Sequence, residues 1–348
     1  WAATVMGLGL VAGYIYALTN TLSYAFFARG FLEETFPQDP SGIGYGISGV
    51  LRDGFQWAGG DMALLTCQAE GATPYHDGFP AAVNSPNPAT DMGEMEITEF
   101  LMPTQVNIGR KLIPDYCGHG KFRGGLGLGV LQMVNEPGIF LQIATFGDTH
   151  GLGACATGRA GGYPTANNVV MYVHGTNMRE LLASGSAYPT DFVEVSRWLQ
   201  EGKLKAENVE VYNGSTPTIQ MQDGDLYSTS AGSRGGWGDI LERRYDLIEE
   251  DVKLGWMTPE SARSVYGAVV DSEGNMDVQA SEALREEMRN RRKERSIDAR
   301  DWWKQERQVV LDKSWPEDVY SMFADNLKWE KSRSEFFGMW QLGEDYTL

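Results

Sequence analysis

Positively charged residues are scarce in this sequence, with 29 Lys and Arg against 47 Asp and Glu and a formal net charge of −18. A surface of that sign repels phosphate backbones, and no run of basic residues interleaved with aromatics offsets it. The charge therefore excludes nucleic acid as an expected partner and is typical of the solvated exterior of a cytoplasmic protein.

Cysteine is rare too. The 3 cysteines, Cys67, Cys117 and Cys155, lie in apolar or glycine-rich surroundings and lack the Cys-x-x-Cys spacing of zinc and redox sites. Because an odd number cannot pair completely, we expect free buried thiols and a reducing compartment.

Charge is absent altogether from residues 1–28. A run of this length is long enough to span a membrane. Its Thr, Asn and small residues interrupt the apolar surface, however, and it lacks the basic leader of a signal peptide. We expect a buried core helix that packs on a part of the subunit outside this chain, with a membrane span as the alternative.

Composition divides the chain into three parts and predicts an α+β fold. Residues 1–59 are expected to be a buried helix and a loop segment that packs on a missing N-terminal half, because residues 31–59 are rich in Gly, Pro and aromatics. Residues 60–232 are expected to form a β-rich core with Gly-rich loops, and residues 233–348 a helical region dense in charge.

Within the β-rich part, a hairpin is predicted. Residues 128–134 and 139–146 are apolar runs on either side of a turn sequence, Asn-Glu-Pro-Gly. The second arm is too apolar for a solvated face, so we expect both of its sides to be covered. Further strands are expected within residues 94–112, 169–174 and 209–212.

The helical part carries clear start and stop signals. Thr258 before Pro259 is typical of a helix N-terminus, and Gly267 is suited to the end of that helix. Apolar residues recur on a helical period within residues 239–254, and further helices are expected at residues 281–295 and 298–311.

Local spacing does not assemble a metal site. The 4 histidines are His76, His119, His150 and His174, and none lies close enough to another for a paired-ligand motif. Asp148 and His150 could share one ion at the end of a strand, but a turn with a satisfied polar pair is the favoured interpretation. No nucleophile elbow and no complete active site are evident.

Two glycine-rich loops are candidate binding elements. In residues 232–239, backbone N–H groups at a helix entrance could hold an anion or a neighbouring subunit, with Arg234, Gly236, Trp237 and Asp239 as contacts. A structural glycine turn is nevertheless the favoured interpretation of residues 232–239. Residues 118–129 have the glycine density of a phosphate loop, but strands follow, which favours tight β packing.

These loops carry a resemblance to a known family. Residues 120–127, Gly-Lys-Phe-Arg-Gly-Gly-Leu-Gly, and residues 235–243, Gly-Gly-Trp-Gly-Asp-Ile-Leu-Glu-Arg, resemble two elements of the hydantoinase B/oxoprolinase family. Ile240 departs from the usual Pro of the second element. Residues 91–96, 161–164, 176–185 and 303–307 resemble the large subunits of the acetone and acetophenone carboxylase branch, over the C-terminal half of the family subunit.

The resemblance implies an ATP-dependent ketone carboxylase in which this subunit joins an activated enol to a carboxyl group derived from bicarbonate. It implies as partners an ATP-binding hydantoinase A-type subunit and a small third subunit. ATP and a divalent metal, Mn or Zn, are implied for the full complex and none for this segment alone, since the family's His/Asp ligands lie in the N-terminal half. The catalytic residues are expected there too. An ATP-dependent hydantoinase or 5-oxoprolinase and a non-catalytic assembly module remain the alternatives.

Overall fold

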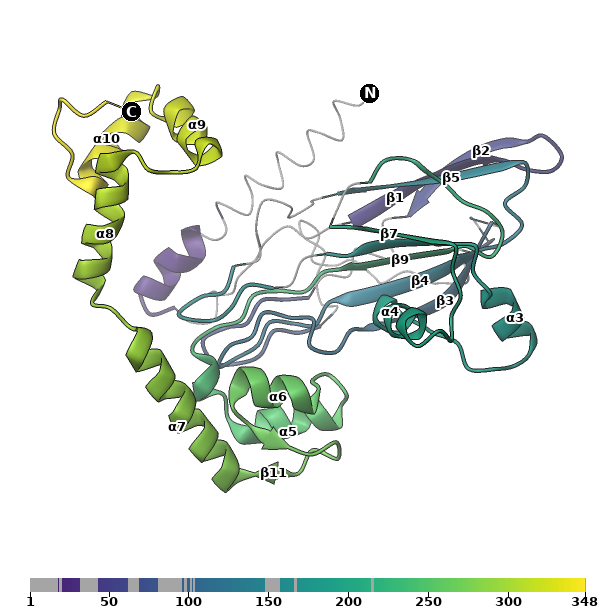
Figure 1. Ribbon diagram of the computed structural model, residues 1–348, viewed down its shortest axis with the longest axis horizontal. Coiled ribbons are helices and arrows are strands. Elements are labelled where there is room, and N and C mark those ends of the chain that lie inside the picture. The colour runs from purple at the N-terminus through teal and green to yellow at the C-terminus, as the bar shows by residue number, and fades with distance from the viewer. Residues whose placement is uncertain are drawn as a thin grey trace. The chain divides into compact units, whose positions relative to one another are not determined.

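The computed structural model describes residues 18, 21–31, 43–61, 69–80, 96, 99–100, 102, 104–147, 157–165, 168–213 and 216–347. The chain divides into two compact units, Trp1–Arg285 and Glu286–Leu348, and each is described by itself. Sheets, helices and a helical C-terminal region are all present (Figure 1), which confirms the predicted α+β class. The predicted boundaries at residues 59 and 232 are not tested by this division and stay predictions.

The first unit contains two antiparallel sheets. One has the order β3-β4-β9-β6-β7 and the other the order β2-β1-β5-β8. The strands of the first sheet are β3 (Gln105–Leu112), β4 (Leu128–Val134), β6 (Val170–His174), β7 (Asn208–Tyr212) and β9 (Leu226–Ala231). Those of the second are β1 (Ile43–Val50), β2 (Gln56–Asp61), β5 (Phe140–Gly147) and β8 (Ile219–Gln220).

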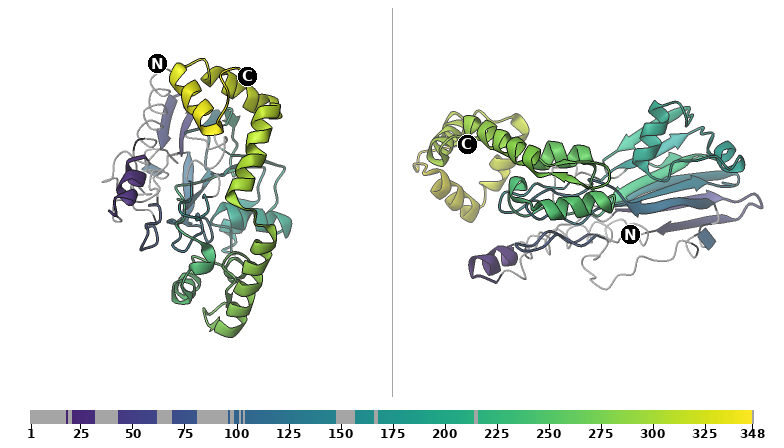
Figure 2. Two further views of the ribbon diagram at one scale, coloured as in Figure 1. Left: turned by 90° about the vertical axis from the view of Figure 1, so that its left-hand side faces the viewer. Right: turned by 90° about the horizontal axis from the view of Figure 1, so that it is seen from below.

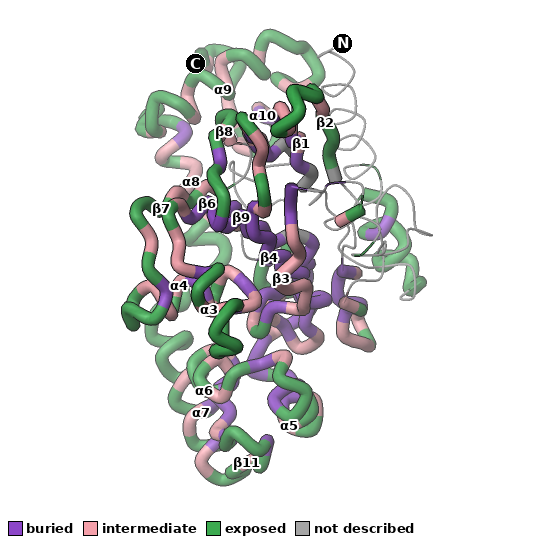
Figure 3. Tube along the Cα trace, turned by 90° about the vertical axis from the view of Figure 1, so that its right-hand side faces the viewer, coloured by how far each residue is buried: buried purple, intermediate pink, exposed green. Residues whose placement is uncertain are grey.

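The two sheets face each other across one hydrophobic core. Tyr45 of β1 and Ile143 of β5 pack there with Val130 of β4 and Tyr172 of β6. The opposite face of the five-stranded sheet is covered by α3 (Met178–Ala183) and α4 (Phe192–Gln200) in a second apolar cluster. Buried residues accordingly gather along β4, β9 and β6 (Figure 3).

The predicted hairpin is wrong, although both of its strands exist. β4 pairs with β3 and β9, whereas β5 pairs with β1 and β8, so the chain crosses from one sheet to the other between them. The expectation that both sides of the second arm are covered is also wrong. Every residue of β4 is buried, because its sheet is covered on both faces. β5 instead alternates, with Leu141 and Ile143 buried and Gln142 only half-buried.

The interpretation of residues 31–59 as loops is corrected as well. β1 and most of β2 lie within this range and pair with each other. Glycines had suggested loops, but in β1 they alternate with Tyr45 and Ile47, which are 1% and 2% exposed. The apolar side chains therefore point to one face, as a half-buried strand requires.

Beyond one end of the sheets lies a helical pair, α5 (Tyr245–Lys253) and α6 (Pro259–Tyr266), preceded by the short 3₁₀ helix η1 (Ile240–Glu242) (Figure 2). The signals for α6 are confirmed. Thr258 accepts a hydrogen bond from the Ser261 N–H, Pro259 is the first helical residue, and Gly267 ends the helix with φ of 59°. A small hairpin, β10 (Val269–Val270) with β11 (Met276–Asp277), leads into α7 (Val278–Arg295).

Residues 21–28 are helical, as predicted, but the expected burial is not observed in this chain. Leu22, Tyr24, Phe26 and Phe27 are each 40% or more exposed, and among residues 21–31 Ser23 alone is buried. Residues 1–17 lie outside the described residues. No helix of the described part is both long and apolar enough to cross a membrane.

The second unit consists of three helices in addition to the end of α7. These are α8 (Ala299–Asp312), α9 (Glu317–Asn326) and α10 (Glu330–Trp340). Its core is small, with Val310 and Phe336 as the buried hydrophobic residues. Trp303 stacks on Trp340, and Trp315, Phe323 and Phe336 cluster nearby.

Candidate functional site

Four extended segments of the first unit are joined to one another by backbone hydrogen bonds. We call residues 69–80, 113–127, 157–165 and 232–239 the glycine-loop layer; they extend from the sheets toward α5 and α6 (Figure 1). The last segment is central and exchanges backbone hydrogen bonds with each of the others: Ala72 N to Gly235 O, Gly118 N to Arg234 O, Trp237 N to Phe122 O, and Arg159 N to Gly236 O.

Glycine is required here because backbones approach each other directly. A Cβ atom at Gly124 would overlap the carbonyl group of Arg234, and one at Gly235 would overlap that of Thr157. In both cases the Cβ-to-oxygen distance would be well below 3.0 Å, closer than real Cβ atoms come to other atoms. The glycines of the two family-like elements thus allow close packing. This is the tight packing that the sequence favoured for residues 118–129 over a phosphate loop.

Two arginines and two aspartates form a buried ionic cluster at the edge of this layer. Arg123 donates to both carboxylate oxygens of Asp251, at 2.9 and 2.7 Å. Arg243 donates to both oxygens of Asp77, each at 2.7 Å, and to Asp251 at 2.6 Å. The cluster joins segments 69–80 and 113–127 to α5, and its two positive and two negative charges balance.

The cluster keeps its charges although it is buried. Burial alone would raise the pKa of Asp77, but the hydrogen bonds and positive charges of Arg243 and Arg123 outweigh it and lower that pKa. Burial opposes the charge of Arg243 in turn, yet its bonds to Asp77 raise the pKa of the guanidinium. The Arg243 side chain is 0% exposed, so the loss of one partner would leave an uncompensated buried charge.

Tyrosine and histidine extend the network. The ring of Tyr266 lies 5.6 Å from the Arg243 guanidinium, and its hydroxyl is 2.9 Å from Nδ1 of His119. Arg285 of α7 donates to the backbone oxygens of Tyr266 and Arg243. Burial lowers the pKa of His119, with Asp115 opposing and Arg243 contributing, so its imidazole is neutral at neutral pH.

Glu70 is a titratable group that the sequence did not single out. It is half-buried beside His76, and burial raises the pKa of its carboxyl while the charge of His76 opposes that rise. No hydrogen bond joins the carboxylate to another described residue. A carboxyl whose pKa is displaced toward neutrality is a candidate proton donor or acceptor.

The predicted contact residues lie in the centre of the glycine-loop layer. Arg234 is 1% and Trp237 6% exposed, and the Gly236 and Trp237 N–H groups donate to the carbonyls of Tyr163 and Phe122. The Asp239 side chain accepts from the Leu241 N–H. The N–H groups of Gly236 and Trp237 are therefore used within the protein, as the favoured interpretation of a structural turn expects, while the anion or subunit contact stays a prediction.

The remaining sequence candidates are dispersed. Cys117 is a buried free thiol, and burial raises its pKa to about 12, so it stays protonated. His174 is the last residue of β6, at the end of the sheet away from the glycine-loop layer. Its Nδ1 is 3.0 Å from a carboxylate oxygen of Asp225. Cys67, Cys155, Asp148 and His150 lie outside the described residues.

The described residues do not fit the divalent metal implied by the family resemblance. Within that part of the chain, no three His, Cys, Asp or Glu side chains come together to hold an ion. The aspartates of the ionic cluster are already paired with arginines, which occupy the oxygens that an ion would need. The metal of the full complex stays a prediction.

The sequence missed the ionic cluster, although half of it lies in the motifs. Arg123 and Arg243 belong to the two family-like elements, but their acid partners Asp77 and Asp251 lie elsewhere. A signal was available at Arg123, which lies in a glycine-rich segment expected to pack tightly, because an arginine that becomes buried requires an acid partner. The sequence alone could not show which acids pair with these arginines, because that depends on how the loops pack together.

The sequence of this chain is similar to those of known proteins. The hydantoinase B/oxoprolinase profile matches residues 43–240. The acetone carboxylase alpha subunit of Xanthobacter autotrophicus is 30% identical over 344 residues, which are 95% of this chain and 43% of that protein. The acetophenone carboxylase delta subunit of Aromatoleum aromaticum is 25% identical over 324 residues, 87% of this chain and 45% of that protein.

Solved structures agree in fold. A nucleotide-free acetone carboxylase structure superposes with a TM-score of 0.80 and 28% identity, over 95% of this chain and 44% of that one. The ATP-dependent caprolactamase of Pseudomonas jessenii has a TM-score of 0.50 at 21% identity, over 74% of this chain and 40% of that one, a likeness of fold alone. The chain spans less than half the length of these relatives. Because the profile covers more than half of the chain and includes the first glycine-rich element, the protein belongs to the hydantoinase B/oxoprolinase family.

Proposed function

We propose that this chain is part of the subunit of an ATP-dependent ketone carboxylase in which an activated enol is joined to a carboxyl group from bicarbonate. The observation that carries the proposal is the similarity to the acetone carboxylase alpha subunit, which extends over 95% of this chain. A second carboxylase subunit, that of acetophenone carboxylase, matches over 87%.

In the proposed reaction, an ATP-binding hydantoinase A-type subunit phosphorylates the ketone's enol and bicarbonate. Carboxyphosphate breaks down to CO₂ and phosphate, and transfer of the enol's phosphoryl group to water leaves an enolate and a second phosphate. The enolate carbon then attacks CO₂ to form the new C–C bond of a 3-oxo acid. The complex would also contain a small third subunit, a divalent metal, Mn or Zn, and would be cytoplasmic. The metal and the reacting groups are assigned to the part of the subunit that this chain does not span.

This chain's contribution would be a rigid support for that site. The ionic cluster ties three separate segments together through charge-assisted hydrogen bonds among four side chains, and such bonds are the strong ones in proteins. Backbone contact between the glycine-rich segments leaves little room for them to shift. A reaction between two short-lived intermediates benefits from a support that does not move.

The test uses the complete complex, with all of its subunits. Ketones should stimulate ATP hydrolysis, and labelled bicarbonate should appear in an acid-stable product; omission of the ATP-binding subunit serves as the control. The absence of both ketone-dependent ATP hydrolysis and bicarbonate incorporation would overturn the proposal.

The second candidate is an ATP-dependent hydantoinase or 5-oxoprolinase, and family membership itself favours it. Assaying 5-oxoproline, hydantoins and ketones side by side separates the two. ATP hydrolysis stimulated by a lactam, with ring opening and without bicarbonate incorporation, would support this alternative.

A non-catalytic assembly module is the third candidate, and it is favoured by exposed apolar side chains. Leu22 and Phe26 lie on one helical face and are 47% and 40% exposed, and Trp302 and Trp329 in the second unit are 50% and 72% exposed. If the module docks through its C-terminal helices, removal of residues 314–348 should prevent assembly of the complex. Unchanged assembly would count against this role.

A further inference from the structure

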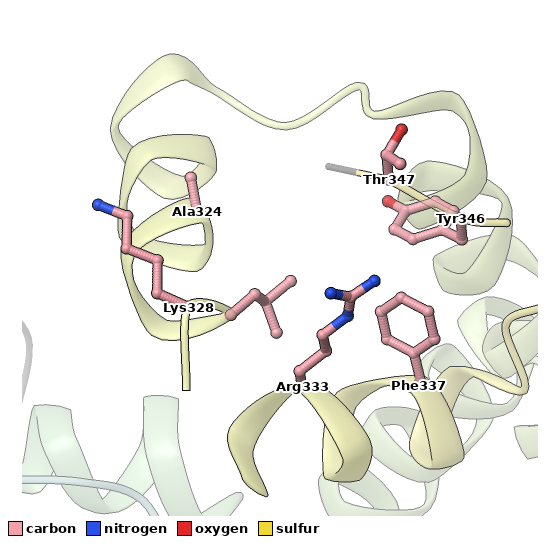
Figure 4. Close-up of a pocket in the computed structure, with 7 residues that line it drawn as sticks. Ala324, Lys328, Arg333, Phe337, Tyr346 and Thr347 are labelled. Atoms are coloured by element: carbon pink, nitrogen blue, oxygen red, sulfur yellow. The ribbon is translucent and has the colours of Figure 1, made fainter. Parts of the chain in front are cut away.

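The second unit contains a cleft of about 250 Å³ between α9, α10 and the C-terminal segment (Figure 4). Its walls are mainly apolar and come from all three elements. They are formed by Ala324, Leu327, Lys328, Arg333, Phe337, Tyr346 and Thr347. All of these residues lie within one compact unit, so the cleft does not depend on how the two units are placed.

The Arg333 guanidinium lies between the walls of this cleft (Figure 4). It lies over the Phe337 ring, 5.1 Å from the centroid. That ring packs edge-on against Tyr346, whose hydroxyl donates to the Val310 carbonyl at 2.8 Å. Contact with the ring holds the planar guanidinium in a defined position. The Arg333 side chain therefore loses less conformational entropy when a ligand binds to it.

Arg333 has no acid partner within the described part of the chain. Lys328, the other cation of the cleft, is paired with Asp325 at 2.6 Å. Toward the described residues the guanidinium N–H donors of Arg333 make no hydrogen bond, and their fork is suited to binding a carboxylate. The cleft therefore combines an apolar wall with one unneutralised positive charge.

A large exposed apolar residue lies at the start of α10, the helix that carries Arg333. Trp329 is 72% exposed and precedes Arg333 by one helical turn, as the hydrogen bond from Arg333 N to Trp329 O shows. Trp, Tyr and Arg are the residues that contribute most to protein–protein interfaces. A second copy of this chain is a poor occupant, because each copy has a formal net charge of −18 and two copies repel each other.

We propose that the cleft binds an acidic side chain with an apolar neighbour, presented by a different subunit of the complex. The carboxylate pairs with Arg333, and the apolar neighbour lies against Leu327, Phe337 and the exposed Trp329. The proposal rests on the proposed function only in that a complex with other subunits exists, and it concerns assembly rather than catalysis.

The first experiment measures assembly of the full complex from purified subunits with Arg333→Glu, Arg333→Gln and Arg333→Lys variants of this chain. Arg333→Glu should weaken the subunit dissociation constant at least tenfold, Arg333→Gln less, and Arg333→Lys should restore part of the loss. Lys331→Glu is the matched control, since it makes the same charge change on α10 at a side chain 89% exposed and outside the cleft. It should change the constant less than twofold, and the Arg333 effect should shrink at high salt.

The second experiment identifies the occupant, with p-benzoylphenylalanine placed at Ala324 and the assembled complex irradiated. A cross-link to a segment of another subunit that contains Asp or Glu beside an apolar residue supports the proposal. A cross-link to a second copy of this chain, or none, overturns it, as does an equal effect of Arg333→Glu and Lys331→Glu. If assembly responds as expected while ketones elicit no ATP hydrolysis, the carboxylase proposal fails and the cleft proposal stands.

Discussion

The arginines of the ionic cluster in the first unit differ from Arg333 of the second unit in burial and in pairing. In the first unit, the side chains of Arg123 and Arg243 are 3% and 0% exposed and form ion pairs with aspartates. In the second, Arg333 is exposed and its charge is not neutralised by a described acid. Position relative to the core therefore decides whether an arginine holds the protein together or is available to something else.

The largest effect should come from breaking the buried pairs. Asp251→Asn leaves Arg123 and Arg243 with Asp77 as their sole remaining acid, and removing one partner of a buried ionic network costs about 3–5 kcal/mol in the free energy of unfolding. Urea unfolding of the full chain measures this. Asp246→Asn, on the same helix but in an exposed pair with Arg244, is the control and should leave the urea midpoint nearly unchanged. Equal effects of the two variants would contradict a buried cluster.

A smaller effect should come from the glycines. Gly124→Ala places a Cβ atom against the Arg234 carbonyl and should destabilise the first unit by about 1–3 kcal/mol, since backbone must move to admit it. In the second unit, Gly338 of α10 has no atom within 4 Å of the added Cβ, and Gly338→Ala should stabilise its helix by about 0.5–1 kcal/mol. Thermal denaturation of both variants checks the contrast. A neutral Gly124→Ala would show that the loops lie further apart in solution.

The smallest effect should be visible only in acid. The pKa of Asp77 is lowered in the folded state from its usual 3.8, so the unfolded chain takes up this proton first as the pH falls. The stability that Asp77 contributes is present above pH 3.8 and is lost as the pH falls through its lower folded value. Urea midpoints measured from pH 5 downward should therefore fall less steeply in Asp77→Asn than in the unsubstituted protein. A slope that is unchanged by the substitution would place the acid sensitivity elsewhere.

Local signals in the sequence were reliable where one element decides its own structure. Thr258, Pro259 and Gly267 predicted the start and end of α6, because capping satisfies groups within a few residues. The strand residues of β4, β6 and β7 were also found by their apolar patterns. Family resemblance added the two glycine-rich elements, whose arginines prove to be half of the ionic cluster.

Long-range pairing could not be read in the same way. The turn at residues 135–138 suggested that β5 pairs with β4. The apolar pattern of β5 is equally compatible with pairing to β1, which is its actual partner and lies far away in the sequence. The glycines of β1 suggested a loop, whereas in the structure they belong to a strand that is paired on both edges. The acids Asp77 and Asp251 were missed because the loop packing that brings them to Arg123 and Arg243 is itself a product of long-range pairing.

The pairing of β1 with the distant strand β5 has a consequence for how this protein folds during its synthesis. β1 can pair with β2 as soon as both have been synthesised, but its other edge pairs with β5, from Val50 with Phe140 to Ile43 with Gly147. That edge must therefore stay unpaired until β5 has emerged. Folds dominated by such distant contacts form slowly, and unpaired strands aggregate while they wait. We therefore expect the yield of folded isolated chain to rise at low temperature or with chaperones present, because both limit aggregation through the unpaired edge of β1.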